Sequence, residues 1–263
     1  MIRIFLSAWL LVLCLALCPA RGLAGEAYCQ PPLRVGLDEW PPYEYFGQSG
    51  KARGLAYEVT VAVLGRMGAK VQQADRLPWS RGLSMLGYGD IDVLVSGVRL
   101  KERENLFLYP DEPVAEARWK MFCLFANREN LEFSAPEELA GSTVGTVRGY
   151  AYPDEFMLRL HNSAAVDVVN SDETNFRKLV NRRVDYVLSD RLNGLWLVHR
   201  LELQGRIVEV GPDIGVRDLY PLFSRKTVSK AFVTCFSEEL RRFKDTDEYR
   251  ALVDRYADGV PTP

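Results

Sequence analysis

The chain has 263 residues, of which 48% are hydrophobic and 26% are charged. This composition excludes a disulfide miniprotein and a disordered tail, and the length allows one large domain or two of ordinary size. The 33 basic and 35 acidic residues leave a net charge of −2, so the sequence does not indicate the cationic surface that nucleic-acid binding needs. Only two histidines occur, His161 and His199, far apart in sequence, which disfavours a histidine metal site or a Ser-His-Asp triad.

The first residues have the pattern of a secretory signal peptide. Arg3 precedes a 15-residue apolar run from Ile4 to Cys18, which is shorter than a membrane span needs. Gly22 and Ala24 put small residues at the positions that a signal peptidase reads. We expect residues 1–24 to be removed and the rest of the chain to be exported. The alternative is an uncleaved membrane anchor.

Three cysteines remain after this cleavage: Cys29, Cys123 and Cys235. An odd number allows at most one internal disulfide, and the sequence does not choose the pair. Cys123 and Cys235 lie within apolar stretches, where a buried thiol is the simplest interpretation.

Strands and helices alternate in the first part of the chain. Residues 33–37 and 91–95 are predicted strands, and residues 71–74 are a weaker candidate. Apolar residues at helical spacing predict helices over residues 55–67 and 79–86. This alternation indicates a parallel sheet with helices on its faces.

The same pattern recurs later in the chain. Strands are predicted over residues 142–147, 166–169 and 184–188, and helices over residues 153–160 and 174–180. This second unit predicts a second α/β lobe.

The closing strands of the two units resemble each other. Asp92 and Asp185 stand at their starts, and Ser96 and Ser189 follow four places later. We expect polar loops after them, at residues 97–99 and 190–192. Two similar lobes are the prediction, with chance similarity between α/β units as the alternative.

Two further segments are predicted to cross between the lobes. Residues 116–125 have the pattern of a long strand, residues 218–224 of a return strand, and residues 229–256 of helix. Two crossing strands form a hinge on which the lobes close around a ligand. We therefore assign residues 25–117 to the first lobe, 118–217 to the second, and 218–263 to the return strand and the C-terminal helices of the first.

The residues that follow the predicted strands are candidates for ligand binding, because ligands of open α/β sheets bind beyond the carboxyl ends of the strands. Aromatic rings supply apolar walls, an arginine can clamp a carboxylate, and an aspartate can hold an ammonium group. This chemistry suits a small zwitterion such as an amino acid. The candidates are Asp38, Glu39, Trp40, Tyr43, Trp79, Ser96, Gly97, Arg99, Arg103, Arg148, Gly149, Tyr150 and Asp190.

Some of these candidates also have a purely structural interpretation. Trp40 stands beside two prolines and could pack in a turn. Arg103 lies in the charge run 101–104, which is typical of a solvated surface.

The order and spacing of several motifs resemble the family 3 extracellular solute-binding proteins. The similarity extends from residue 33 to residue 256 and rests on segments 33–36, 41–43, 54–59, 89–97, 102–104, 109–113, 138–145, 148–149 and 183–190. It implies a type II periplasmic-binding-protein fold, α/β, in which two lobes, each a mostly parallel sheet flanked by helices, are joined by two hinge strands. It also implies a monomeric periplasmic receptor that captures a polar amino acid or related solute for an ABC importer, with a permease as partner and no cofactor.

The resemblance implies roles for individual residues. Trp40 and Trp79 match the aromatic walls around the ligand side chain. Arg103 matches the arginine that grips the α-carboxylate, and Gly97 supplies a backbone contact near it.

The remaining roles fall in the second lobe. Tyr150 and Ala151 match a helix start whose N–H groups meet the carboxylate, and Asp190 matches the acid that binds the α-ammonium group. The segment 97–103 is one residue shorter than in the family and lacks its hydroxyl residue. Arg99 stands near that place, so we expect it to accept a second anionic group of an acidic or modified ligand.

Two alternatives to transport stay open at this point. One is a module that senses a ligand without transporting it, since both functions use the same cleft. The other is a dehydratase-like enzyme on the same fold, for which Glu39 or Asp190 would be the general acid.

Overall fold

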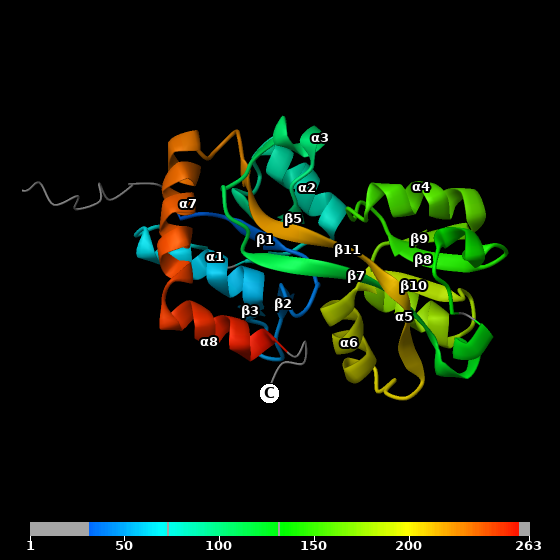
Figure 1. Cartoon of the computed structure of the whole chain (residues 1–263). Helices are drawn as coiled ribbons and strands as arrows, with labels where there is room; N and C mark the ends of the chain where they lie inside the picture. Colours follow the sequence, from blue (N-terminus) through cyan, green and yellow to red (C-terminus); the bar gives the residue numbers. More distant parts are fainter. Residues whose placement is uncertain (1–31, 73, 131, 258–263) are drawn as a thin grey trace, which may run out of the picture.

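The computed structural model describes residues 32–257, except residues 73 and 131 and the side chains of residues 128–130. The predicted signal peptide, its cleavage site and Cys29 lie outside the described residues. Figure 1 shows two lobes joined by a pair of long strands. None of the helices in the described residues has the length and apolar character to cross a membrane.

The first lobe contains the start and the end of the described chain. Its strands are β1 (Val35–Leu37), β4 (Asp75–Arg76), β5 (Val93–Val98) and β6 (Phe107–Leu108), with a small hairpin of β2 (Tyr45–Phe46) and β3 (Ala52–Arg53). Its helices are α1 (Leu55–Arg66), α2 (Trp79–Tyr88), α3 (Lys101–Glu104), α7 (Lys230–Lys244) and α8 (Asp247–Tyr256). Strand β1 lies between β4 and β5 and is parallel to both, as the alternation of strands and helices predicts.

Helices cover both faces of this sheet. Side chains alternate along β5, so Val93 and Val95 join the core under α1 and α7, whereas Leu94 joins the core under α2. Gly54 precedes α1 with a φ of 119°, and a side chain there would collide with the backbone of Tyr43. Glycine at this position is therefore needed to bring α1 against the turn that follows β1.

The second lobe repeats this arrangement. Its strands are β8 (Thr143–Val147), β9 (Ala165–Val169) and β10 (Tyr186–Asp190), and its helices are α4 (Asp154–Ser163), α5 (Asp172–Val180) and α6 (Arg191–Arg200), with 3-10 turns at Phe125–Asn130 and Pro136–Leu139. Strand β8 is parallel to β9 and β10. Phe122 and Phe176 of α5 are fully buried in the core of this lobe, with ring centroids 5.3 Å apart.

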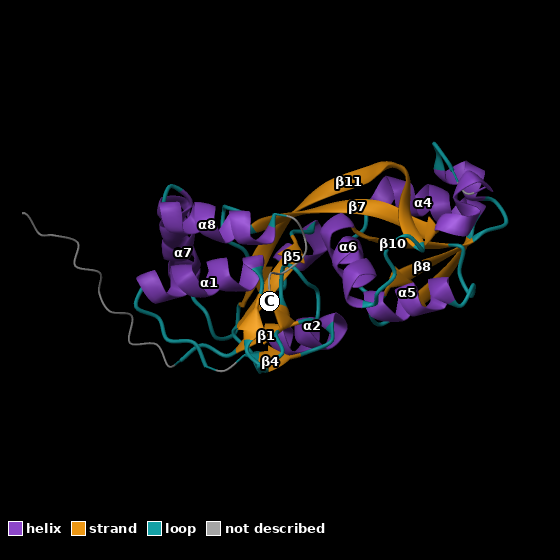
Figure 2. Cartoon of the chain, turned by 90° about the horizontal axis from the view of Figure 1, so that it is seen from below, coloured by secondary structure: helices purple, strands orange, loops and turns teal. Residues whose placement is uncertain are grey.

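Two strands run through both lobes. β7 (Ala115–Leu124) and β11 (Ile207–Ser224) pair antiparallel, β5 pairs with β11 in the first lobe, and β10 pairs with β7 in the second. Figure 2 shows the two strands side by side along the connection. Their register shifts between Val210 and Gly215, where Asp213 accepts from the guanidinium of Arg118 at 3.1 Å. The predicted lobe boundaries at residues 117 and 217 lie within this ladder.

The structure corrects several predicted elements. Residues 190–192 are not a polar loop: helix α6 begins at Arg191, because the Asp190 carboxylate accepts from the amide of Asn193 at 2.9 Å and so caps it. In the other predicted loop, Gly97 and Val98 belong to β5. The return strand is also much longer than residues 218–224, because β11 pairs with β7 in both lobes.

Two smaller corrections concern the first lobe. Residues 229–256 form two helices, because Thr246 caps α8 through its hydroxyl, which accepts from the Tyr249 amide at 3.2 Å. In place of the weak strand predicted at residues 71–74, Val71 forms a single β-bridge with Leu33. The paired strand, β4, follows it in the sequence.

Two helical glycines test the packing of the lobes. We predict that Gly194→Ala, in α6, lowers the free energy of unfolding by about 1–3 kcal/mol, because its new methyl group would collide with the Phe122 ring. Gly65→Ala, in α1, is the matched control: nothing lies within 4 Å of its added carbon, so it should stabilise by about 0.5–1 kcal/mol. Denaturant unfolding measures both changes. Equal effects of the two substitutions would contradict this packing.

Candidate functional site

A small cavity lies between the two lobes. Its volume is about 30 Å³, the room of one or two water molecules. The lining residues come from both lobes and from both connecting strands: Asp38, Trp40, Glu44, Trp79, Ser96, Gly97, Val98, Arg103, Trp119, Tyr150, Ala151 and Leu219.

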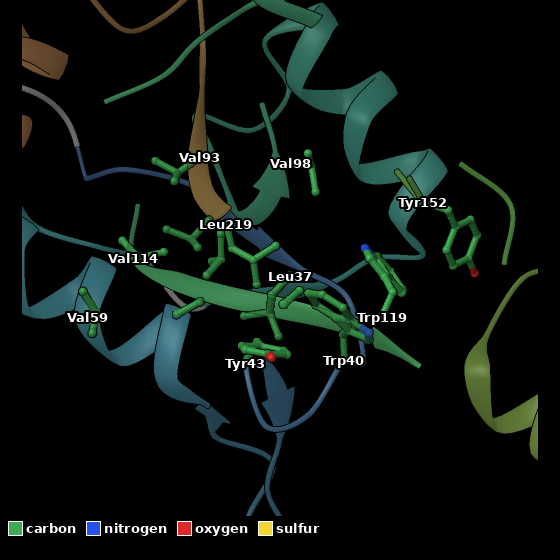
Figure 3. Close-up of a cluster of buried hydrophobic side chains, with 14 of the residues drawn as sticks. Leu37, Trp40, Tyr43, Val59, Val93, Val98, Val114, Trp119, Tyr152 and Leu219 are labelled. Carbon is green, nitrogen blue, oxygen red and sulfur yellow. The ribbon is translucent and has the colours of Figure 1, made fainter. Parts of the chain in front are cut away.

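Aromatic rings form most of the wall. The rings of Trp40 and Trp119 are stacked with centroids 6.3 Å apart, and Figure 3 shows them side by side. Tyr150 meets Trp40 edge-on at 5.8 Å, and Tyr152 packs on Trp119 at 4.6 Å. Trp119 comes from β7 and Tyr150 from the second lobe, so closure of the lobes brings these rings together.

The carbonyl group of Gly149, in the second lobe, accepts hydrogen bonds from the first lobe. It accepts from Trp79 Nε1 at 3.0 Å and from Arg103 Nη2 at 2.9 Å, both in the first lobe. Gly149 has a φ of 77°, a conformation that side chains disfavour. A further contact runs from Asn193 Nδ2 to the carbonyl of Pro41 at 2.6 Å.

Arg103 is the basic side chain that lines the cavity. Its guanidinium lies 5.6 Å from the centre of the Trp79 ring and also reaches the carbonyl of Val98 at 3.4 Å. Burial lowers the pKa of Arg103, but an arginine keeps its charge in proteins.

Two carboxyl groups of the first lobe also line the cavity. Asp38 follows β1, and burial raises its pKa to about 6. Glu44 is 1% exposed, and burial, with the nearby Asp38 carboxylate, holds its pKa well above the usual range. Glu44 Oε1 accepts from the Asp38 amide at 3.2 Å, and hydrogen bonding with Ser96 offsets part of the rise in the pKa of Glu44.

Two more buried carboxyl groups come from the second lobe. Asp190 accepts from the Arg118 amide at 2.8 Å and lies 3.2 Å from the Tyr43 hydroxyl, yet burial still raises its pKa to about 6. Asp172, at the start of α5, is 5% exposed, and Ser189 and Tyr150 are its hydrogen-bonding neighbours. Burial raises the pKa of Asp172 to about 7.

The structure brings most of the predicted site residues together. The cavity wall contains Asp38, Trp40, Trp79, Ser96, Gly97, Arg103, Tyr150 and Ala151, and Gly149 adjoins it through its two donors. Tyr43 and Asp190 do not line the cavity but meet behind it.

The other predicted residues lie away from the cavity wall. The guanidinium of Arg99 pairs with Glu104 at 2.6 Å and stands over the ring of Tyr109. Arg148 is exposed, and Glu39 pairs with Arg76 at 3.2 Å.

Glu44 and Trp119 are the chief wall residues that the sequence did not indicate. Trp119 sits inside the predicted hinge strand 116–125, and in the structure it is buried with Ala117 and Met121. Glu44 follows a Pro-Pro-Tyr turn, where an acid is ordinarily solvated. The one available signal was an acid placed between Tyr43 and Tyr45 just after the first strand.

The sequence was compared with known families and structures. A family described as "Bacterial extracellular solute-binding proteins, family 3" matches residues 33–259. No curated protein sequence is significantly similar to this chain.

Solved structures match almost their full length. A histidine kinase sensor domain with similarity to periplasmic binding proteins is 23% identical with a TM-score of 0.77, over 89% of this chain and 99% of that one. An ancestral arginine-binding protein bound to arginine is 20% identical with a TM-score of 0.75, over 86% and 97%. An ancestral amino acid-binding protein, precursor of cyclohexadienyl dehydratase, is 18% identical with a TM-score of 0.73, over 86% and 95%. These likenesses confirm the predicted two-lobe fold.

We predict that the ligand-free protein is more stable at about pH 5 than at about pH 8. With pKa values of about 6 and 7, Asp38, Asp190 and Asp172 keep protons in the folded state that the unfolded state releases above 3.8. The free energy of unfolding therefore falls as pH rises between about 5 and 8, by about 2–3 kcal/mol for Asp172 alone. Thermal unfolding at the two pH values measures the difference.

Asp172→Asn provides the control for this prediction, because it removes the group whose pKa is raised most among the three. The difference in melting temperature between the two pH values should shrink in this variant. A wild-type protein that melts higher at about pH 8 would contradict the prediction.

Proposed function

We propose a function from one premise: the chain belongs to the bacterial extracellular solute-binding proteins of family 3. The protein is a receptor that closes its two lobes around a small polar solute, an amino acid or a related compound, and leaves it chemically unaltered. Arg103 binds a carboxylate of this solute, and Trp40 and Trp79 cover its apolar surface.

The observation that supports this proposal is the position of the cavity. Residues of both lobes line the cavity. In the described residues, the chain passes between the lobes in β7 and β11. A ligand held there touches both halves only when they are together, so it has a higher affinity for the closed form. Binding then shifts the population toward closure, and a partner can recognise the closed shape.

The size of the cavity indicates that the lobes must move. A volume of about 30 Å³ is far below the several hundred Å³ of ordinary ligand pockets. The Tyr150 ring and the contacts at the Gly149 carbonyl fill the space between the lobes. An amino acid therefore enters when the hinge opens and Tyr150 withdraws from Trp40.

The biological setting follows from the same proposal. The chain acts as a monomer in the periplasm after removal of its signal peptide and delivers the solute to an inner-membrane ABC permease. A second candidate is ligand sensing without transport, which the likeness to a kinase sensor domain favours. A dehydratase-like activity is the least favoured alternative, because the matched family and the arginine-binding neighbour are binding proteins.

A thermal-shift screen of amino acids and related small acids tests the proposal. A true ligand at a hundred times its Kd should stabilise the folded protein by about 2.7 kcal/mol. For a chain of this size the melting temperature should then rise by about 5–10 °C. Mass spectrometry after incubation should recover the ligand unchanged. Conversion of the ligand would indicate an enzyme, and no shift with any compound would refute the receptor.

Trp79→Ala should weaken binding of the solute found in this screen by about 1–3 kcal/mol, because the ring covers the ligand and its N–H group bonds the opposite lobe. Tyr88→Ala is the matched control, since Tyr88 is on the same helix and 82% exposed. Isothermal titration measures both affinities. Equal losses in the two variants would place Trp79 outside the binding site.

A further inference from the structure

We infer that the ligand of this receptor carries a net positive charge, with an ammonium or guanidinium group held beside Glu44 and Asp38. This inference rests on the proposed function and narrows its solute to small organic cations, in particular basic amino acids and related amines.

Glu44 provides the first argument. Its side chain lines the cavity with 1% of its surface exposed, and no basic side chain of the described residues pairs with its carboxyl group. A buried carboxylate without a cationic partner is costly, and a cationic hydrogen-bond donor removes that cost best. The Glu44 side chain borders the cavity, so the cationic donor that its carboxylate needs comes from the ligand.

The charges around the cavity provide the second argument. Within residues 32–257, as far as they are described, none of the carboxyl groups of Asp38, Glu44, Asp172 and Asp190 forms an ion pair. Asp172 and Asp38 both act electrostatically on Tyr150, which stands between the lobes. Arg103 is the one basic residue in the wall, so the closed lobes bring more carboxyl groups than basic groups to the cavity.

The neighbouring basic side chains do not pair with these carboxyl groups. Arg118 meets Asp190 through its backbone amide, while its guanidinium pairs with Asp213. Arg99 pairs with Glu104 outside the wall. An acidic solute would therefore meet one arginine and the two carboxyl groups of Asp38 and Glu44, whereas a cation compensates this excess of acids.

The aromatic wall provides the third argument. The rings of Trp40, Trp119 and Tyr150 line the same cavity, and aromatic rings attract ammonium and guanidinium groups. A metal ion does not fit this setting, because no three His, Cys, Asp or Glu side chains of the described chain are grouped closely enough to hold one. The cation that suits these rings and carboxylates is organic.

Arg103 keeps a place for a carboxylate within the same ligand. The site thus matches a solute with one carboxylate and two cationic groups, which is the charge pattern of arginine or lysine. An amine without a carboxylate satisfies the acids but leaves Arg103 unused.

Isothermal titration with matched pairs of solutes tests the inference. Arginine and citrulline have the same length but differ in charge, as do lysine and norleucine, and glutamate supplies the anionic comparison. We expect at least one cation to bind about tenfold or more tightly than its neutral partner. A neutral solute or glutamate that binds as tightly as the cations overturns the inference and leaves the proposed receptor standing. No binding of any of these solutes overturns the inference, and the wider screen then decides the receptor.

Glu44→Gln separates ligand binding from folding. It removes the charge but keeps the size, so affinity for the cation should fall about tenfold or more while the melting temperature at about pH 8 holds or rises. Glu248→Gln, on the exposed surface of α8, should change neither. If Glu44→Gln does not fold, Asp38→Asn takes its place in the same measurement. Unchanged affinity in the variant that folds overturns the inference.

Discussion

The antiparallel pairing of β7 with β11 is the constraint on which the rest of the molecule depends. Each lobe completes its sheet on this pair, through β5 against β11 and β10 against β7. Trp119 on β7 and Leu219 on β11 therefore belong both to the connection and to the cavity wall. Any change in the angle between the lobes passes through the backbone that carries these side chains, so closure and the shape of the site change together.

The four buried carboxyl groups fall into two kinds, and backbone donors make the difference. The Asp190 carboxylate accepts hydrogen bonds from the amides of Arg118 and Asn193. These bonds offset much of the free-energy cost of burying it. Glu44 and Asp172 are less well satisfied, since burial outweighs the hydrogen bonds with Ser96 and with Ser189 and Tyr150 that lower their pKa values. Asp190 thus helps hold α6 and β7 in place, whereas Glu44 retains capacity for a group that arrives from outside.

The alternation of strands and helices could be predicted from the sequence because side-chain periodicity is local. The start of α6 could not, because Asp190 was interpreted only as a ligand-binding acid although the same carboxylate caps the helix. The wall residues Trp40, Trp79 and Arg103 follow or precede predicted strands, so the topology rule found them. The role of Glu44 could not be predicted, because its surroundings include Ser96, far away in sequence, and no local pattern records such contacts.

In the proposed receptor, Arg103 both links the lobes and binds the ligand. A guanidinium has five N–H groups, and the contacts to the carbonyls of Gly149 and Val98 use only part of them. The remaining N–H groups are free to take a carboxylate without releasing Gly149. A ligand whose cationic group also pairs with the Glu44 carboxylate would then stabilise the closed form at both ends of the cavity. Selectivity for charge and closure of the hinge would in that case have the same cause, since the groups that discriminate between solutes are those that the closed lobes bring together.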